Sequence, residues 1–224
     1  MLLLAGASVN AQNLVYRIGT ASAITSATVE PNYTAEMISS LSPLTAGIGL
    51  TAESSKTWKW NGFFSSSKES AILNNDYWTW SFSTSSDINL NQISLSLDRT
   101  IPGPASFFLG YDINPVATNN ANYLSYIQII QSTVGSSGQT YTQSFNDLPL
   151  KAGEKITFVI TAWSGAGSLR LLNSDALGDP DSGFEVYNGL SGIAVTATIP
   201  EPSSLSLLLA GGAVLMASRR TRRA

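Results

Sequence analysis

Two pairs of tryptophans are the residues whose type and spacing most clearly suggest binding chemistry in this chain. The pairs are Trp58 with Trp60 and Trp78 with Trp80. Residues two apart on a β-strand share one face, so each pair would hold two indole rings side by side. Exposed rings could stack on the apolar faces of sugars, whereas buried rings would fill the space between two sheets. Lys59 and Thr79, which separate the partners, favour the buried interpretation, and the glycan platform stays open as the alternative.

A second group of polar residues is the acidic segment "NSDALGDPDSGFE", which gathers Asp175, Asp179, Asp181 and Glu185. Carboxylates at short spacings in a glycine-containing loop are weak candidates for Ca²⁺ ligands. The segment lacks the spacing of an EF-hand loop, and Asp-Pro-Asp-Ser-Gly is also an ordinary turn sequence. We therefore predict no metal site here and keep calcium as the weaker alternative.

Catalytic groups are scarce because the chain contains neither histidine nor cysteine. This excludes the Ser/His/Asp triad, cysteine nucleophiles, disulfides and thiolate metal sites. A glycosidase would need two carboxylates about 5–9.5 Å apart, but Glu154, Asp112 and Asp98 stand singly beside turns. We predict no enzyme, no catalytic residue and no cofactor, with a glycan hydrolase as the least favoured function.

The charge pattern separates a body from a tail. Charged residues are 12% of the 224 residues, about half the share usual in soluble domains. Residues 12–199 hold eight basic and fourteen acidic side chains, whereas the other four basic residues are the terminal arginines Arg219, Arg220, Arg222 and Arg223. An acidic body lacks the basic patch that nucleic acid requires, so we predict no nucleic-acid partner.

The elements that must position these residues are strands. Period-2 alternation recurs in segments such as "NQISLSLDRT" and "KITFVITAW", and glycine, proline, asparagine and aspartate clusters separate them. Helical periodicity is missing before Ser203, apart from one helical turn that could form in residues 35–44. Nine or ten short strands in about 190 residues predict an all-β fold, a two-sheet antiparallel sandwich that is jelly-roll-like. We expect strands near residues 14–18 and 192–198 to lie close together.

Both ends differ from this body. Residues 1–11 end in "VNA", which fits a signal-peptidase site, although the basic start is missing and the apolar region is short. Residues 203–218 carry no charge and would form a short transmembrane helix of about 24 Å, near the lower limit for a span. The arginines after it would stay on the cytoplasmic side and leave the body outside.

The last 25 residues resemble a known sorting signal. Pro200, Glu201 and Pro202, then an apolar helix, then an arginine cluster, are similar to the PEP-CTERM signal of Gram-negative-type bacteria. The resemblance implies an exosortase-type membrane enzyme as partner, cleavage near Pro-Glu-Pro, transient anchoring in the inner membrane and release outward. Such proteins are associated with exopolysaccharide and biofilm formation.

Three regions and one main function follow from these patterns. Residues 1–11 are expected to be a truncated signal peptide, 12–199 the sandwich domain and 200–224 the sorting signal. We expect an exported, non-enzymatic protein of the cell surface or extracellular matrix that is linked to exopolysaccharide. The alternative function is a carbohydrate-binding module that uses the Trp-x-Trp strands, with polysaccharide as its partner.

Overall fold

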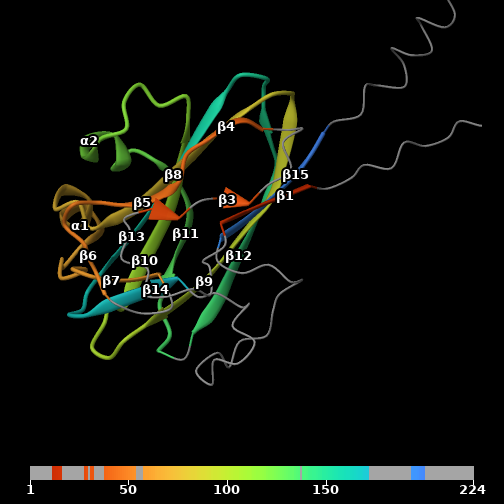
Figure 1. Ribbon diagram of the computed structural model, residues 1–224. Helices are drawn as coiled ribbons and strands as arrows, with labels where there is room; N and C mark the ends of the chain where they lie inside the picture. The colour runs from red at the N-terminus through yellow and green to blue at the C-terminus, as the bar shows by residue number, and fades with distance from the viewer. Residues whose placement is uncertain are drawn as a thin grey trace, which may run out of the picture.

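Two antiparallel β-sheets packed face to face form the body of the protein (Figure 1). The structure is a computed structural model, which describes residues 12–16, 28–29, 31–32, 38–53, 58–136, 138–171 and 193–199. The two sheets confirm the two-sheet antiparallel sandwich that the alternation predicted. Both end segments of the prediction, 1–11 and 200–224, lie outside the described residues. Within the described part, no helix has the length and apolarity to cross a membrane.

The eight-stranded sheet is built around one long central strand, β9 (Ile88–Arg99). On one side β9 pairs with both β14 (Ser168–Leu171) and β15 (Ile193–Thr198), and on the other with β12 (Gln139–Leu150). The remaining strands are β1 (Gln12–Tyr16), β3 (Pro31–Asn32), β6 (Thr51–Ala52) and β7 (Trp58–Asn61). β1 pairs with β15 from Gln12↔Ala197 to Tyr16↔Ile193, so the first and last described strands are neighbours, as expected.

The seven-stranded sheet runs β11-β10-β13-β8-β5-β2, and β4 also pairs with β8. Its strands are β2 (Thr28–Val29), β4 (Ile38–Leu41), β5 (Leu44–Ala46), β8 (Tyr77–Thr84), β10 (Ser106–Ile113), β11 (Ile127–Thr133) and β13 (Lys155–Trp163). The helical turn expected within residues 35–44 is not found where the structure describes them, because β4 and β5 occupy most of this stretch. Two-residue strands such as β2 and β6 raise the strand number above the nine or ten expected.

Strict alternation places one face of each central strand in the core. In β8 every second residue from Trp78 to Thr84 is buried, and β9 alternates likewise around an irregularity at Asn91 and Gln92. Leu95 and Leu97 of β9 belong to the same buried cluster as Phe82 and Phe158 of the opposite sheet. Burial of these side chains, worth about 1.5–3 kcal/mol each, holds the two sheets together.

A second, smaller apolar cluster covers the outer face of the seven-stranded sheet. Helices α1 (Lys68–Leu73) and α2 (Asn120–Tyr123) lie next to each other there, at the left of Figure 1. The cluster joins Ile72, Phe108, Tyr123, Tyr126 and Val159. It explains why β13 is apolar on both faces. A capping box between Ser67 and Ser70 starts α1, which is too short for a 3.6-residue period to show in the sequence.

Candidate functional site

Three of the four tryptophans, Trp60, Trp78 and Trp80, are buried, as the favoured interpretation of the sequence predicted, and this corrects the carbohydrate-binding alternative in its Trp-x-Trp form. Trp78 and Trp80 are 0% and 1% exposed, and Trp60 is 5% exposed. Trp80 stacks on Phe158, with ring centroids 4.9 Å apart and planes 11° apart. The physical reason is that β8 is a central strand, so the face that carries its rings is covered by the other sheet. The side chain of Trp58 lies outside the described residues.

The carboxylates singled out in the sequence fall into two sets, one outside the described residues and one within them. Asp175, Asp179, Asp181 and Glu185 lie outside the described residues, and within the described part no group of acidic side chains could hold a metal ion. Asp98 is paired with Arg170, and Glu154 accepts hydrogen bonds from the Lys151 backbone and from Asn114. Asp98 and Glu154 are therefore held in structural contacts.

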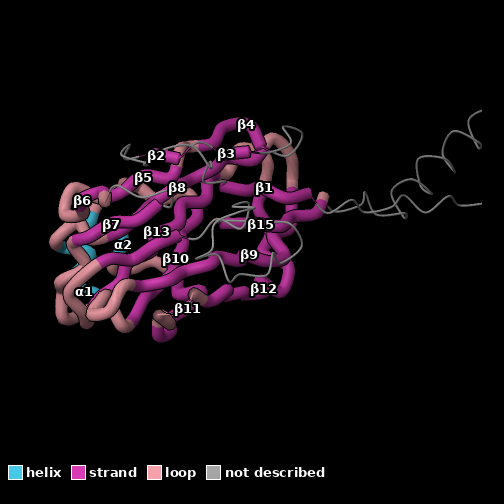
Figure 2. Tube along the Cα trace, turned by 60° about the horizontal axis from the view of Figure 1, so that its bottom comes forward, coloured by secondary structure: helices cyan, strands magenta, loops and turns pink. Residues whose placement is uncertain are grey.

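A hollow of about 370 Å³ opens between the edges of the two sheets, and we call it the edge hollow. Its walls are β11, the edge strand of the seven-stranded sheet, and β12, which pairs with β9 alone in the described part of the other sheet. The chain passes directly from β11 to β12, so both edges lie on the same side of the sandwich (Figure 2). The inter-sheet space is therefore accessible from this side.

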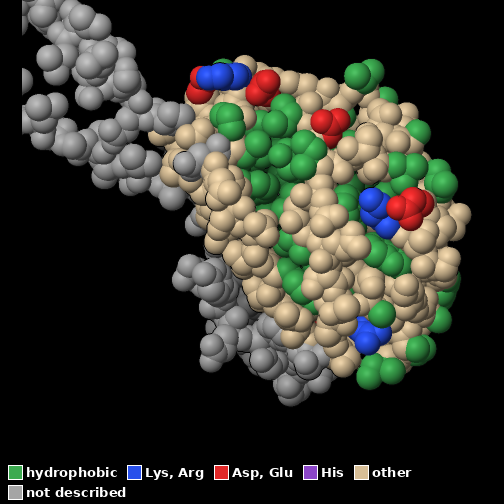
Figure 3. All heavy atoms as spheres, turned by 180° about the vertical axis from the view of Figure 1, so that it is seen from behind, with side chains coloured by type: hydrophobic (Ala, Val, Ile, Leu, Met, Phe, Trp, Pro, Cys, Tyr) green, Lys and Arg blue, Asp and Glu red, His purple; other side chains and the backbone are tan. Residues whose placement is uncertain are grey.

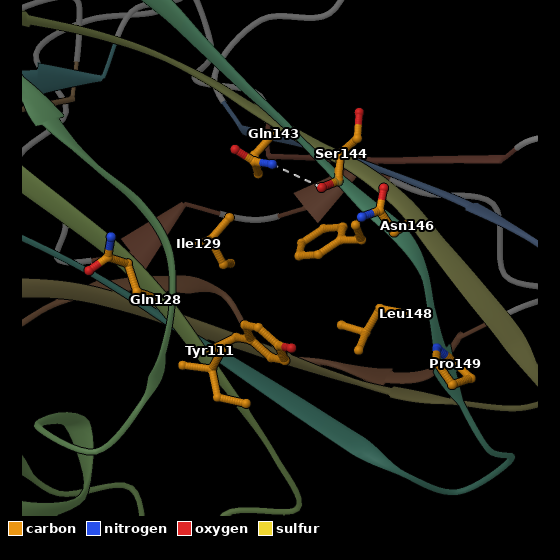
Figure 4. A pocket seen from close by; sticks show the side chains of 10 residues that line it. Tyr111, Gln128, Ile129, Gln143, Ser144, Asn146, Leu148 and Pro149 are labelled. Atoms are coloured by element: carbon orange, nitrogen blue, oxygen red, sulfur yellow. Dashed lines mark hydrogen bonds between the residues drawn. The ribbon is translucent and has the colours of Figure 1, made fainter.

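Aromatic and aliphatic side chains form the floor of the edge hollow. Tyr111, Ile129 and Leu148 point toward one another in Figure 4. Phe145 also lines the hollow, and all four side chains pack against the main core. The rings of Tyr111 and Phe145 meet edge to face, with centroids 6.1 Å apart and planes at 81°. Ile127 and Pro149 complete the apolar lining.

Irregularities in both edge strands create this floor. The register of β12 against β9 jumps from Ser144↔Gln92 to Leu148↔Leu90, so residues 145–147 face the single residue Asn91. Asn146 takes a positive φ of 42° at this point. A bulge bends its strand and redirects side chains, and here it brings Phe145 to the hollow.

The opposite wall has its own extra residue. β11 pairs with β10 as Leu109↔Ile130 and then as Gly110↔Gln128, which leaves Ile129 without a cross-strand partner in β10. Glycine is required at position 110, because a Cβ atom there would lie 2.5 Å from the Phe108 ring. Ile129, the extra residue at this irregularity, lines the hollow.

The rim of the edge hollow is polar and uncharged. It consists of Gln128, Gln143, Ser144 and Asn146, and the Gln143 amide donates to the Ser144 carbonyl at 3.0 Å. From behind, hydrophobic side chains gather in a sunken strip, and charged side chains are few on that face (Figure 3). Amides and hydroxyls both donate and accept hydrogen bonds, so this rim matches ligands that do the same.

Of the described residues that line the hollow, Tyr111 alone can titrate. Burial raises the pKa of its hydroxyl, and the negative charge of Asp112 raises it further. The hydroxyl therefore stays protonated at neutral pH. Among the described residues that line the hollow there is no carboxylate pair and no nucleophile next to a base, the groups that acid–base catalysis uses.

The sequence pattern did not reveal the edge hollow. Its residues are ordinary strand residues, and the hollow depends on two register shifts between strands distant in sequence. The one local signal is "SFNDLPL", where Asn-Asp followed by proline marks an irregular edge strand.

Comparison with known proteins adds structural neighbours only. No protein-family model matches the chain, and no curated protein sequence matches it significantly. Among solved structures, a carbohydrate-binding module of family 29 aligns with a TM-score of 0.39 and 9% identity, over 84% of this chain and 90% of the module. Two point variants of a family 29 module align with TM-scores of 0.37 and 0.35 at 9% and 10% identity, over 84% and 89% of this chain and 93% and 97% of theirs. Values this low do not place the chain in that family.

Proposed function

We propose that the sandwich is a non-catalytic carbohydrate-binding domain and that the edge hollow is its binding site. The observation that carries the proposal is the lining of the hollow, an apolar floor with two aromatic rings below a rim of neutral amide and hydroxyl groups. Ligand sites are typically apolar clefts of about 300–1,000 Å³ with a few placed polar groups, and the edge hollow falls within this range.

The chemistry of the lining favours a neutral glycan. A sugar ring presents an apolar C–H face to an aromatic or aliphatic floor and directs its hydroxyls sideways to a polar rim. None of the described residues that line the hollow is basic, so none could pair with a carboxylate, sulfate or phosphate group on the ligand. The negative charge of Asp112 near Tyr111 further disfavours an anionic ligand.

Binding can be tested with the purified full chain by affinity electrophoresis in gels that contain a neutral glucan or mannan, or an acidic polyuronate. We expect retardation by a neutral polymer, no retardation by the polyuronate, and no release of reducing sugar. Gln143→Ala should weaken binding about fivefold, because one hydrogen bond contributes about 0.5–1.5 kcal/mol. Thr142→Ala, an exposed change one residue away outside the hollow, is the matched control.

Two outcomes would contradict this assignment. If both substitutions weaken retardation equally, the hollow is not the site. If no glycan in the panel retards the chain, the carbohydrate-binding function is wrong.

We also propose that the chain is exported and sorted by its C-terminal segment. The support is in the sequence: Pro200, Glu201 and Pro202, an uncharged stretch and four arginines follow one another in the order of a PEP-CTERM signal. The acidic, neutral-polar body suits an extracellular location. Placed there by an exosortase-type enzyme, a glycan-binding domain would contact exopolysaccharide at the cell surface or in the matrix.

Sorting is tested separately from binding. In the native host, alanines at Pro200, Glu201 and Pro202 should leave the chain uncleaved and in the membrane fraction, whereas the unchanged chain should appear outside with a lower mass. Identical mass and location for both chains, measured by mass spectrometry of cell fractions, would refute the sorting signal.

A further inference from the structure

The outer edge of β11 is the one long edge in the described part of the sandwich that nothing in its sequence protects. The strand reads "IQIIQST" and contains no charged residue and no proline. In the described residues it pairs with β10 alone. Ile127 at its start is 56% exposed. Beyond the extra residue Ile129, the strand keeps a regular register with β10 from Ile130 to Thr133. An exposed, uncharged edge of this kind offers its free backbone groups to another strand.

The other described edges carry features that hinder pairing with a further strand. β2, β3 and β6 have only two residues each, and β3 contains Pro31. β12 is as long as β9, but its ladder is broken between Ser144 and Leu148 and contains Pro149. Short strands, prolines and bulges are the means by which natural sheets prevent edge-to-edge pairing. β11 has one such irregularity, at Ile129, but it contains no proline and no charged residue. Its register with β10 is regular from Ile130 to Thr133, so this part of its edge is the place where a strand can be added.

The backbone of β11 is oriented for such pairing. The Val134 N–H donates to the Ala105 carbonyl at 3.0 Å, so this pair exchanges hydrogen bonds with β10. Hydrogen-bonded and non-bonded pairs alternate in an antiparallel ladder, and Thr133 is opposite Ser106 while Gln131 is opposite Phe108. The N–H and C=O groups of Gln131 and Thr133 therefore point away from β10, and both side chains are exposed.

We propose that β11 pairs antiparallel with β11 of a second copy of this chain, which joins the two seven-stranded sheets across a twofold axis near Gln131. Two identical strands satisfy each other's outward backbone groups symmetrically in this arrangement. Identical copies also carry identical charges, and like charges directly opposite across a strand pair are destabilising. The uncharged β11 avoids this cost, although the described body is acidic overall.

Pairing would bring two edge hollows close together, because Gln128 lines the hollow three residues from Gln131. At about 3.4 Å per residue, the two hollows would lie on the order of 20 Å apart. A polymer that reached both hollows would be held with greater avidity than by either hollow alone. The dimer itself does not depend on what the hollows bind.

Analytical ultracentrifugation over a range of concentrations tests this proposal, because it measures the oligomeric state of the full chain in detergent. The tail-deleted chain is measured in parallel. We expect a monomer–dimer equilibrium that Gln131→Lys weakens about fivefold, the upper end expected for one like-charge cross-strand pair. An equimolar mixture of Gln131→Lys and Gln131→Glu should restore dimers, and each of these dimers should contain one copy of each variant. Thr142→Lys, an exposed change on β12, is the matched control and should leave the equilibrium unchanged.

Thr133→Pro provides a stronger block, because it removes one outward N–H that the partner strand would use. Circular dichroism establishes whether each variant is folded. If the proline variant is unfolded, the mixture of Gln131→Lys and Gln131→Glu tests the strand pairing in its place. A wild-type chain that stays monomeric at all concentrations overturns the proposal. So does a dimer that Gln131→Lys and Thr142→Lys weaken equally, or that the mixture fails to restore.

Discussion

Two groups of aromatic side chains in this sandwich have opposite surroundings. Trp78 and Trp80 lie on β8, a central strand of the seven-stranded sheet, and are sealed between the sheets. Tyr111 and Phe145 lie on β10 and β12, at the side where both sheets end, and only part of each ring is covered. The first group holds the sheets together, whereas the second forms the floor of a hollow open to ligands.

This difference shows that an aromatic pattern on a strand does not by itself identify a binding surface. The regular W-x-W spacing arises from a central strand, where a two-residue period means one buried face. The rings of the hollow have no such spacing, because a bulge in β12 and a register shift beside Gly110 bring them together. Position at the sheet edge and local irregularity therefore distinguish the candidate site from the core.

The largest expected effect is a loss of stability when a ring of the buried group, Trp78 and Trp80, is removed. Trp80→Ala should lower the free energy of unfolding by about 3–5 kcal/mol, because it removes a fully buried ring that stacks on Phe158. Urea denaturation followed by circular dichroism measures this loss. A cost below about 1 kcal/mol would mean that the ring is not in the core, and the contrast between the two groups would disappear.

Phe145→Ala should separate stability from binding. Phe145 is only half-buried, so its loss should cost about 1–2 kcal/mol of unfolding free energy and should weaken glycan binding about tenfold. Ile113→Ala is the control, since Ile113 packs at the margin of the same core without lining the hollow. It should lower stability by a comparable amount and leave binding unchanged. Equal binding losses in both variants would show that the effect arises from stability alone.

The sequence was sufficient for the architecture of the sandwich. Alternation in β8, β9 and β13 indicated strands with one core face, and the turn clusters indicated antiparallel connections. The neighbouring positions of β1 and β15 were also predicted correctly. The strands and their buried faces follow from local periodicity, because a two-residue period specifies which face is buried.

The sequence was not sufficient for the candidate site. The edge hollow requires β11 and β12 to lie on the same side of two different sheets, and the cluster beneath α1 and α2 requires Val159 and Phe108 to share an outer face. Both depend on pairings between residues far apart in the chain, which one sequence does not encode as a period. The sorting signal at residues 200–224 stays a prediction.

A smaller effect concerns a buried carboxyl group on the core side, that of Asp76. Asp76 is 4% exposed, and burial raises its pKa although Ser65 donates a hydrogen bond to it at 2.8 Å. The folded state then holds a proton that the unfolded chain loses at lower pH. Stability from this group is full below the ordinary pKa of aspartate and falls as pH rises through the raised pKa.

Asp76→Asn should remove this pH dependence. The unfolding free energy of the wild type minus that of the variant should decrease from acidic to neutral pH, as measured by urea denaturation at several pH values. Asp87 provides a control of opposite sign, because hydrogen bonds from Lys151 and from the Ala152 backbone lower its pKa. For Asp87→Asn the same difference should increase with pH. A difference for Asp76 that is constant or rises with pH would contradict its raised pKa.

The smallest expected effect is on the hollow side, where binding should not depend on pH. Neither the amides nor Ser144 titrate, and burial raises the pKa of Tyr111 above its ordinary value, so the lining keeps one charge state between about pH 5 and 8. Affinity for a neutral glycan should therefore stay constant over this range, within the range where the protein is folded. A change larger than about threefold (about 0.65 kcal/mol) would show that an ionisable side chain contacts the ligand.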